Sequence, residues 1–165
     1  MASHRIIALL TFCTALSSGL IAGVFFAFST FVMNALARLP PAQGIAAMQS
    51  INVAVFSPWF MGIFLGTGAS CIVLAISGLL GWAQPGAAFR VIGSALYLVG
   101  ALGVTLAFNV PRNEALSLIP PEGLGAPNFW MRYVAEWTSW NHVRGVATFI
   151  ASALLTVAAA RRGLP

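Results

Sequence analysis

Long stretches without a charged residue constrain this chain more than any other feature of its sequence. No Arg, Lys, Asp or Glu occurs in residues 6–37, 39–89 or 91–111. A helix needs about 20 apolar residues to cross the roughly 30 Å hydrocarbon core of a bilayer, so each run is long enough for a span. Only 7% of the 165 residues are charged, whereas about a quarter are charged in a soluble domain. The sequence therefore predicts an integral membrane protein.

A fourth span follows the last interior arginine. The charge-free run after Arg144 covers only residues 145–160, so a helix of bilayer length must begin near Asn141 or earlier. We therefore predict an all-α membrane four-helix bundle, a single transmembrane domain over residues 1–165, with spans at about 5–36, 45–82, 89–109 and 128–160. Pro58 indicates that the second segment is either one kinked span or a short amphipathic helix joined to a span, and Pro111 is expected to end the third.

The charged residues exclude several functional classes. The net charge of +5 comes from eight arginines and three glutamates, with no lysine and no aspartate. The arginines are scattered near the predicted span ends instead of clustering on one face, so the sequence does not favour nucleic-acid binding. With so few acidic residues and one useful histidine, no set of three or four metal ligands is found, and there is no Ser-His-Asp set or phosphate loop. We expect neither a metal nor another cofactor.

Arginine positions also predict the orientation. Four spans place both termini on the same side of the membrane. The terminal end carries slightly more arginines than the other end: Arg5, Arg90, Arg161 and Arg162 against Arg38, Arg112 and Arg132. Because loops rich in Arg and Lys stay in the cytoplasm, we expect cytoplasmic termini.

The first half of the last predicted helix carries a stripe of aromatic and polar side chains. At about 100° per residue, six residues fall on one face of this helix, namely Trp130, Tyr133, Trp137, Trp140, Asn141 and Arg144. His142 lies about 120° from Trp130 on the same wheel, away from the centre of the stripe. A charge at the centre of a membrane helix costs about 2.5–3.5 kcal/mol, so an inward-facing Arg144 needs polar partners.

Side-chain amides on other helices are expected to meet this stripe. Gln49 and Asn52 share a helix face with large aromatic residues, and Asn109 and Asn113 flank Pro111. The ends of the first and third spans lie on the same side as the starts of the second and fourth, so these groups gather at one end of the bundle. They can form an aromatic belt with interhelical hydrogen bonds, or they can line a pocket. Both interpretations stay open at this point.

Four strings carry a resemblance to a known family. GVFFAFSTFVMNALARLP (23–40), AMQSIN (47–52), NVPRN (109–113) and WTSWNHVR (137–144) resemble, in content and order, the anthrone oxygenase-like family of small membrane proteins. Many members are bacterial and have no defined function. The resemblance implies matching positions at Phe26, Phe28, Met33, Met48, Gln49, Asn52, Asn109, Pro111, Asn113, Trp137, Asn141 and Arg144. Asn34 and Arg112 depart from the family pattern, and Arg112 adds a charge beside the expected pocket.

The resemblance also implies a reaction. Fungal members oxidise a polyketide anthrone to the anthraquinone with molecular oxygen and without a bound metal or flavin. Such an enzyme needs a base, stabilisation of the enolate and a dry aromatic slot. We expect His142 as the catalytic base and Arg144 as the catalytic residue that stabilises the oxyanion. The expected substrate-binding residues are Phe28, Gln49, Asn52, Asn109, Asn113, Trp137, Trp140 and Asn141.

Two other functions fit the same residues. The chain could be a binding or transport protein for a lipophilic small molecule, or a docking module for another membrane protein. Under all three hypotheses we expect the lipid bilayer as a partner and no nucleic acid. The two hypotheses that require a pocket allow a lipophilic aromatic small molecule as its ligand. Homo-oligomerisation is left open. The expected location is the inner (plasma) membrane of a bacterium.

Overall fold

A computed structural model describes residues 2–161 of the chain, with the side chains of residues 5–161. Its described part contains four helical rods that are long and apolar enough to cross a membrane: Arg5–Ala37, Pro58–Leu80, Ala87–Ser117 and Ala126–Arg161. These rods confirm the predicted all-α membrane four-helix bundle. The chain is therefore an integral membrane protein.

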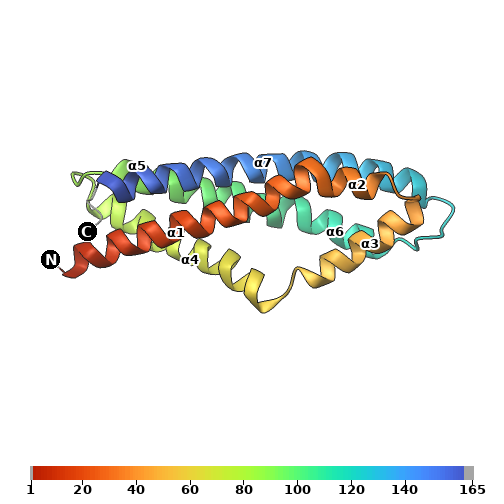
Figure 1. Cartoon of the computed structure of the whole chain (residues 1–165), viewed down its shortest axis with the longest axis horizontal. Coiled ribbons are helices and arrows are strands. Elements are labelled where there is room, and N and C mark those ends of the chain that lie inside the picture. Colours follow the sequence, from red (N-terminus) through yellow and green to blue (C-terminus); the bar gives the residue numbers. More distant parts are fainter. Residues whose placement is uncertain (1, 162–165) are drawn as a thin grey trace.

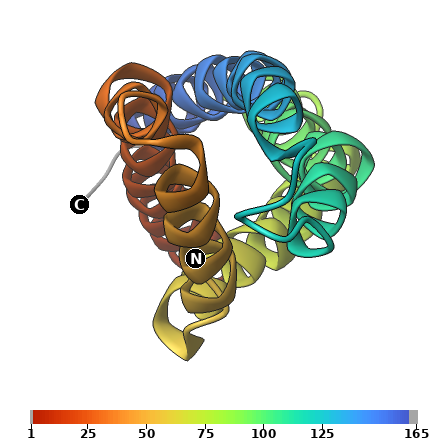
Figure 2. The ribbon, with the colours of Figure 1, turned by 90° about the vertical axis from the view of Figure 1, so that its right-hand side faces the viewer.

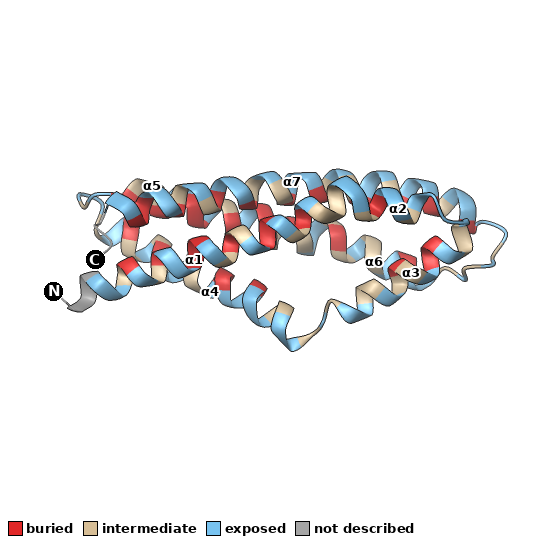
Figure 3. Ribbon diagram, viewed as in Figure 1, coloured by how far each residue is buried: buried red, intermediate tan, exposed pale blue. Residues whose placement is uncertain are grey.

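The rods form a ring when the bundle is viewed end-on (Figure 2). The first rod comprises α1 (Ala2–Ala27), the π-helix η1 (Phe28–Val32) and α2 (Met33–Ala37). It packs against α7 (Ala126–Arg161) on one side and α4 (Pro58–Leu80) on the other, and α5 (Ala87–Ala95) closes the ring between α4 and α7. Buried residues lie along the inner faces of the rods (Figure 3).

Small and hydroxyl-bearing residues bring α1 and α7 together. Ser18 Oγ donates to the Thr148 carbonyl at 3.1 Å, and Ser152 Oγ donates to the Ala15 carbonyl at 2.8 Å. Small residues allow close approach of helix backbones in a membrane, where polar side chains also gain by bonding across the interface. These contacts fix α1 beside the helix that carries the predicted stripe.

The bundle is longer than a bilayer core is thick. α7 has 36 residues and measures about 54 Å at ~1.5 Å per residue, whereas α4 has 23 residues and measures about 35 Å. The excess length lies at the end formed by α2, α3 (Pro41–Ala54), α6 (Val110–Ser117) and the first half of α7, which we call the polar end. α1 begins and α7 ends at the opposite end (Figure 1).

The second hydrophobic segment consists of two helices. α3 and α4 are separated by residues 55–57, which we call the elbow, and the two helices meet there at a point set apart from the rest of the bundle (Figure 1). Ser57 Oγ accepts a hydrogen bond from the Phe60 amide at 3.4 Å, and Pro58 occupies the first turn of α4. Because Pro lacks an amide hydrogen and suits the first turn of a helix, this sequence starts a new helix. The structure thus has the short helix joined to a span.

The third rod does not end where the sequence predicts. It continues through Pro111 as α5, the π-helices η2 (Leu96–Gly103) and η3 (Thr105–Asn109), and finally α6. The prediction that Pro111 ends this helix at Asn109 is therefore wrong.

The π-type turns explain why the proline is tolerated. In an α-helix, the ring of Pro111 would clash with the carbonyl four residues earlier. Immediately before this proline, however, the Val110 amide bonds to the Thr105 carbonyl, five residues back. The wider turn changes the position of the preceding carbonyls. In addition, Arg112 Nη1 donates to the Phe108 carbonyl at 2.8 Å, so a side chain helps to satisfy the backbone beside the proline.

Candidate functional site

A cavity of about 250 Å³ lies among the helices at the elbow. We call it the central cavity. Residues of α1, η1, α3, α4, the third rod and α7 contribute to its wall, which is mostly apolar and aromatic. Its polar lining consists of Asn52, Thr105, Asn109, Asn113, Asn141 and Arg144. Buried cavities with a few convergent polar groups are the usual form of small-molecule sites.

The Arg144 side chain is the charged group of this cavity. The residue is only 6% exposed, and its Nη2 donates to Asn141 Oδ1 at 2.6 Å while Nη1 donates to Thr105 Oγ1 at 3.2 Å. Its Cζ lies 4.4 Å from the centroid of the Phe25 ring and 5.1 Å from that of Trp137. Aromatic faces attract a cation through their quadrupole, so these contacts stabilise the guanidinium without neutralising it.

No described carboxylate forms an ion pair with Arg144. The three glutamates of the sequence, Glu114, Glu122 and Glu136, are all exposed. Arg144 Nε is buried and has no hydrogen-bond partner among the described residues. A buried charge without a counter-ion is unfavourable, and an oxyanion in the cavity would remove that penalty.

Asn141 connects Arg144 to the first rod. Its Nδ2 donates to the Phe25 carbonyl at 2.7 Å and to Ser29 Oγ at 2.6 Å, while its Oδ1 accepts from Arg144. The residue is fully buried, and both ends of its amide are therefore committed. Asn141 therefore links the guanidinium to α1 through its side-chain amide.

The three π-helices all contribute residues to the cavity. Phe28 belongs to η1 and Leu102 to η2, and Thr105 and Asn109 belong to η3. π-type turns are rare and occur frequently at functional sites. Here each π-helix changes the directions in which successive side chains point where the rod meets the cavity.

Two of the other three cavity amides have an unsatisfied buried atom. Asn113 Oδ1 accepts from Tyr133 Oη at 2.9 Å and from Trp137 Nε1 at 2.8 Å, which fixes the orientation of its amide. Asn109 Nδ2 donates to the Trp137 carbonyl at 3.3 Å, but its Oδ1 is buried without a partner in the described part of the chain, as is Asn52 Nδ2. Buried polar atoms are nearly always paired with protein or water. A bound polar molecule would account for these two.

Seven of the ten predicted site residues line the central cavity, and three do not. Gln49 Nε2 donates to the Leu116 and Ile119 carbonyls at 2.9 and 3.0 Å, so it caps the end of α6. Trp140 stacks on Phe108, with ring centroids 3.6 Å apart and an interplanar angle of 8°. His142 is exposed on α7, because it lies off the inward face, as the helical wheel predicts. The structure places these three outside the set that surrounds Arg144.

Sequence reasoning missed two residues that contact Arg144. Phe25 contributes a ring face and Thr105 a hydroxyl. The signal for Thr105 was present, since it is the one hydroxyl residue in the apolar run ALGVTLAF (101–108), and isolated polar groups in a span often mark a functional interior.

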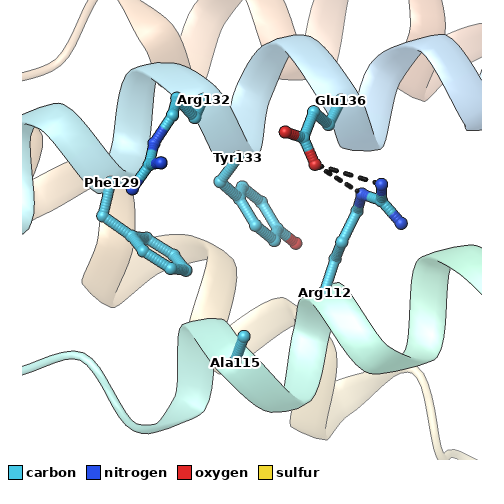
Figure 4. A pocket seen from close by; sticks show the side chains of 6 residues that line it. All are labelled: Arg112, Ala115, Phe129, Arg132, Tyr133 and Glu136. Carbon is cyan, nitrogen blue, oxygen red and sulfur yellow. Dashed lines mark hydrogen bonds and ion pairs between the residues drawn. The ribbon is translucent and has the colours of Figure 1, made fainter.

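Arg112 belongs to a separate, outer cavity of about 230 Å³ between α6 and α7 (Figure 4). Its Nε and Nη2 both lie 3.0 Å from Glu136 Oε2. Phe129, Arg132 and Tyr133 line the same outer cavity. The charge that departs from the family pattern therefore does not enter the central cavity.

The sequence model of the anthrone oxygenase family matches residues 56–154, from the elbow to the second half of α7. The chain belongs to the anthrone oxygenase family. The segment matched to anthrone oxygenases contains Asn113, Trp137, Asn141 and Arg144, whereas Phe25 and Asn52 precede it. No curated protein and no solved structure matches the chain significantly.

Proposed function

We propose that this member of the anthrone oxygenase family binds a planar polycyclic phenolic compound in the central cavity and oxidises it with molecular oxygen. The observation that carries the proposal is the buried guanidinium of Arg144, which is held between two aromatic rings and has no acidic partner in the described part of the chain. The cavity volume of about 250 Å³ is at the small end of ligand sites. That size suits a flat three-ring compound better than a whole lipid.

Each group of the cavity has a role in this proposal. Arg144 stabilises the oxyanion of the enolate, and Asn141 holds Arg144 in place. Phe28 and Trp137, whose ring centroids are 5.8 Å apart at 54°, provide the aromatic walls. Asn52, Asn109 and Asn113 contact the polar edge of the ligand. We do not assign the proton-accepting role to His142, because it is exposed on α7.

The reaction balances without a cofactor. An anthrone loses a proton from its central methylene to give an enolate whose negative charge is delocalised onto the oxygen. The enolate passes one electron to O₂, and the resulting radical pair combines to form a C–O bond. Protonation gives a hydroperoxide, and loss of water from it leaves the second carbonyl. One anthrone and one O₂ thus yield one anthraquinone and one water.

Oxygen uptake by the purified protein tests this proposal. In an uncharged detergent, the wild-type protein should consume one O₂ per anthraquinone formed from anthrone, above the rate with heat-denatured protein. Removal of one preorganised oxyanion donor typically lowers a rate by about 10²–10³-fold. We therefore expect the oxygen-uptake rate of Arg144→Gln to be at least tenfold lower than that of the wild type. Arg112→Gln removes an arginine of the outer cavity and should retain the wild-type rate.

Two results would contradict the proposal. Uptake no faster than with denatured protein would exclude the oxygenase reaction with this substrate, and tight anthrone binding in the same sample would then favour a carrier. Equal rates for the wild type and a folded Arg144→Gln variant would show that Arg144 takes no part in the reaction.

We further propose that the protein lies in a bacterial inner membrane with cytoplasmic termini, which places the polar end and the elbow toward the outer face.

A further inference from the structure

The described side chains that usually accept protons lie away from the central cavity. Glu114, Glu122, Glu136 and His142 are all exposed, and none of them lines the cavity. Lysine and aspartate do not occur in the sequence. Among the residues whose side chains the structure describes, the cavity wall therefore offers amides, one threonine hydroxyl, an indole and the Arg144 guanidinium, but no conventional general base.

The groups that face Arg144 are all uncharged. α1 presents the Phe25 ring, η3 presents the Thr105 hydroxyl, and α7 itself presents Trp137 and Asn141. α4 contributes only apolar side chains to the cavity wall, and α3 contributes apolar side chains and one amide. The positive charge is therefore not offset from any of these directions.

The nearest titratable hydroxyl groups are committed to hydrogen bonds. Tyr133 Oη donates to Asn113 Oδ1 at 2.9 Å, and Tyr97 Oη donates to the Phe64 carbonyl at 2.9 Å. Each hydroxyl hydrogen is thus already donated to a protein acceptor, an amide oxygen for Tyr133 and a backbone carbonyl for Tyr97. The guanidinium is thus the main ionic group that a ligand in the cavity meets.

The guanidinium also has donors available for an anion. A guanidinium carries five N–H groups in one plane. The Phe25 and Trp137 rings lie over it, while Nη1 and Nη2 each make one hydrogen bond to a protein side chain. Nη1 and Nη2 therefore each keep a second N–H group in the plane of the guanidinium, whereas Nε is buried and has no partner in the described part of the chain. An oxyanion in the cavity can bind to these remaining N–H groups of Nη1 and Nη2.

We propose that Arg144 takes the place of a general base: the ligand ionises when it binds, because its oxyanion is stabilised by the buried guanidinium, and its proton passes to water. This inference rests on the proposed function and defines its substrate class. The cavity accepts compounds that lose a proton to give a delocalised aromatic oxyanion, such as anthrones and polycyclic phenols. Hydrocarbons and fully substituted ketones, which cannot ionise, bind more weakly.

Alizarin is a suitable probe, because its phenolate has a visible absorption distinct from the neutral form and the compound is not consumed by oxygen. Its absorbance is titrated against pH, once in dodecyl maltoside micelles and once bound to the protein in the same detergent. We expect the pKa of alizarin to be at least one unit lower when it is bound, which is a tenfold larger ionisation constant. Arg144→Gln should abolish the shift, and Arg112→Gln should preserve it.

A second measurement uses only the wild-type protein and does not depend on a variant that folds. The affinity for anthrone should rise with pH, whereas the affinity for 10,10-dimethylanthrone, which has no acidic C–H, should be weaker and independent of pH. Equal pH dependence for the two compounds would overturn the inference.

The outcomes separate this inference from the oxygenase reaction. An unchanged or raised pKa of bound alizarin, or a lowered pKa that persists in Arg144→Gln, would overturn the inference even if anthrone is oxidised. Displacement of alizarin by decanoate at equal or lower concentration than anthrone would also overturn it, because the ligand class would then be a lipid carboxylate. A lowered pKa without oxygen uptake would support the inference and exclude the oxygenase reaction.

Discussion

Replacing Asn141 by leucine, a residue of similar size, removes three hydrogen bonds at the centre of the bundle. Two of them join α7 to the Phe25 carbonyl and Ser29 Oγ, and the third is accepted from Arg144. An interhelical hydrogen bond in a membrane protein contributes about 0.6 kcal/mol on average, and a bond from a charged group contributes about 1.5–3 kcal/mol. The variant should therefore lose about 3–4 kcal/mol of unfolding free energy.

Two small substitutions give the scale for this measurement. Ser29→Ala removes one of the three bonds and should lose about 0.6 kcal/mol. Thr156→Ala removes a hydroxyl that is exposed and bonds only to the Ser152 carbonyl of its own helix, so its effect should be close to zero. The free energies are obtained from unfolding in mixed SDS and dodecyl maltoside micelles, followed by tryptophan fluorescence.

The ranking of these variants decides whether the reasoning is correct. A loss below 1.5 kcal/mol for Asn141→Leu, or a loss no larger than that of Ser29→Ala, would refute a charge-assisted bond between Asn141 and Arg144. A double-mutant cycle with Arg144→Gln adds an independent test. Because the two residues are in direct contact, the combined loss should be smaller than the two separate losses together, by about 1 kcal/mol or more.

The remaining predictions concern packing, surface charge and orientation. A Cβ at Gly100 would overlap an alanine Cβ of α7, whereas a Cβ at Gly103 would make only ordinary contacts. In the same unfolding assay, Gly100→Ala should therefore lose about 1–3 kcal/mol of unfolding free energy, and Gly103→Ala should be neutral or stabilising. Arg112→Gln breaks an ion pair whose side chains are 26% and 56% exposed, so it should change the unfolding free energy by less than about 1 kcal/mol, and by less still in high salt. Leu124 is fully exposed in the loop at the polar end. In intact cells a Leu124→Cys variant should therefore react with a membrane-impermeant maleimide if the termini are cytoplasmic, and labelling only after lysis would indicate the opposite orientation.

The spans and the inward face of α7 could be predicted because their physical signals are local. Charge-free runs identify membrane helices directly, since a bilayer excludes charge along a whole span. The wheel located Trp137, Asn141 and Arg144 on one face because α7 is an unbroken α-helix with a constant angle per residue. It also put Trp140 on that arc, and only the position of Phe108 shows that this ring stacks outside the central cavity.

The third rod could not be predicted in the same way. Its π-type turns change the angle per residue, so a wheel drawn at about 100° does not follow one face along this rod. The same turns let the helix continue past Pro111, where it was predicted to end. Gln49 was misplaced for a related reason: its acceptors are carbonyls at the end of α6, which lies beyond the predicted end of the third span.

Two arginines of this chain show what the central cavity requires. Arg112 is partly exposed and is paired with Glu136, where solvent already reduces the value of an ion pair. Arg144 is buried, where a carboxylate partner would relieve a far larger desolvation penalty, yet it is held by an amide, a hydroxyl and two ring faces. If stability alone determined these two positions, the glutamate would accompany Arg144. Neutral partners keep the guanidinium in place and leave its charge uncancelled, which is the arrangement expected where the counter-ion is supplied by a ligand.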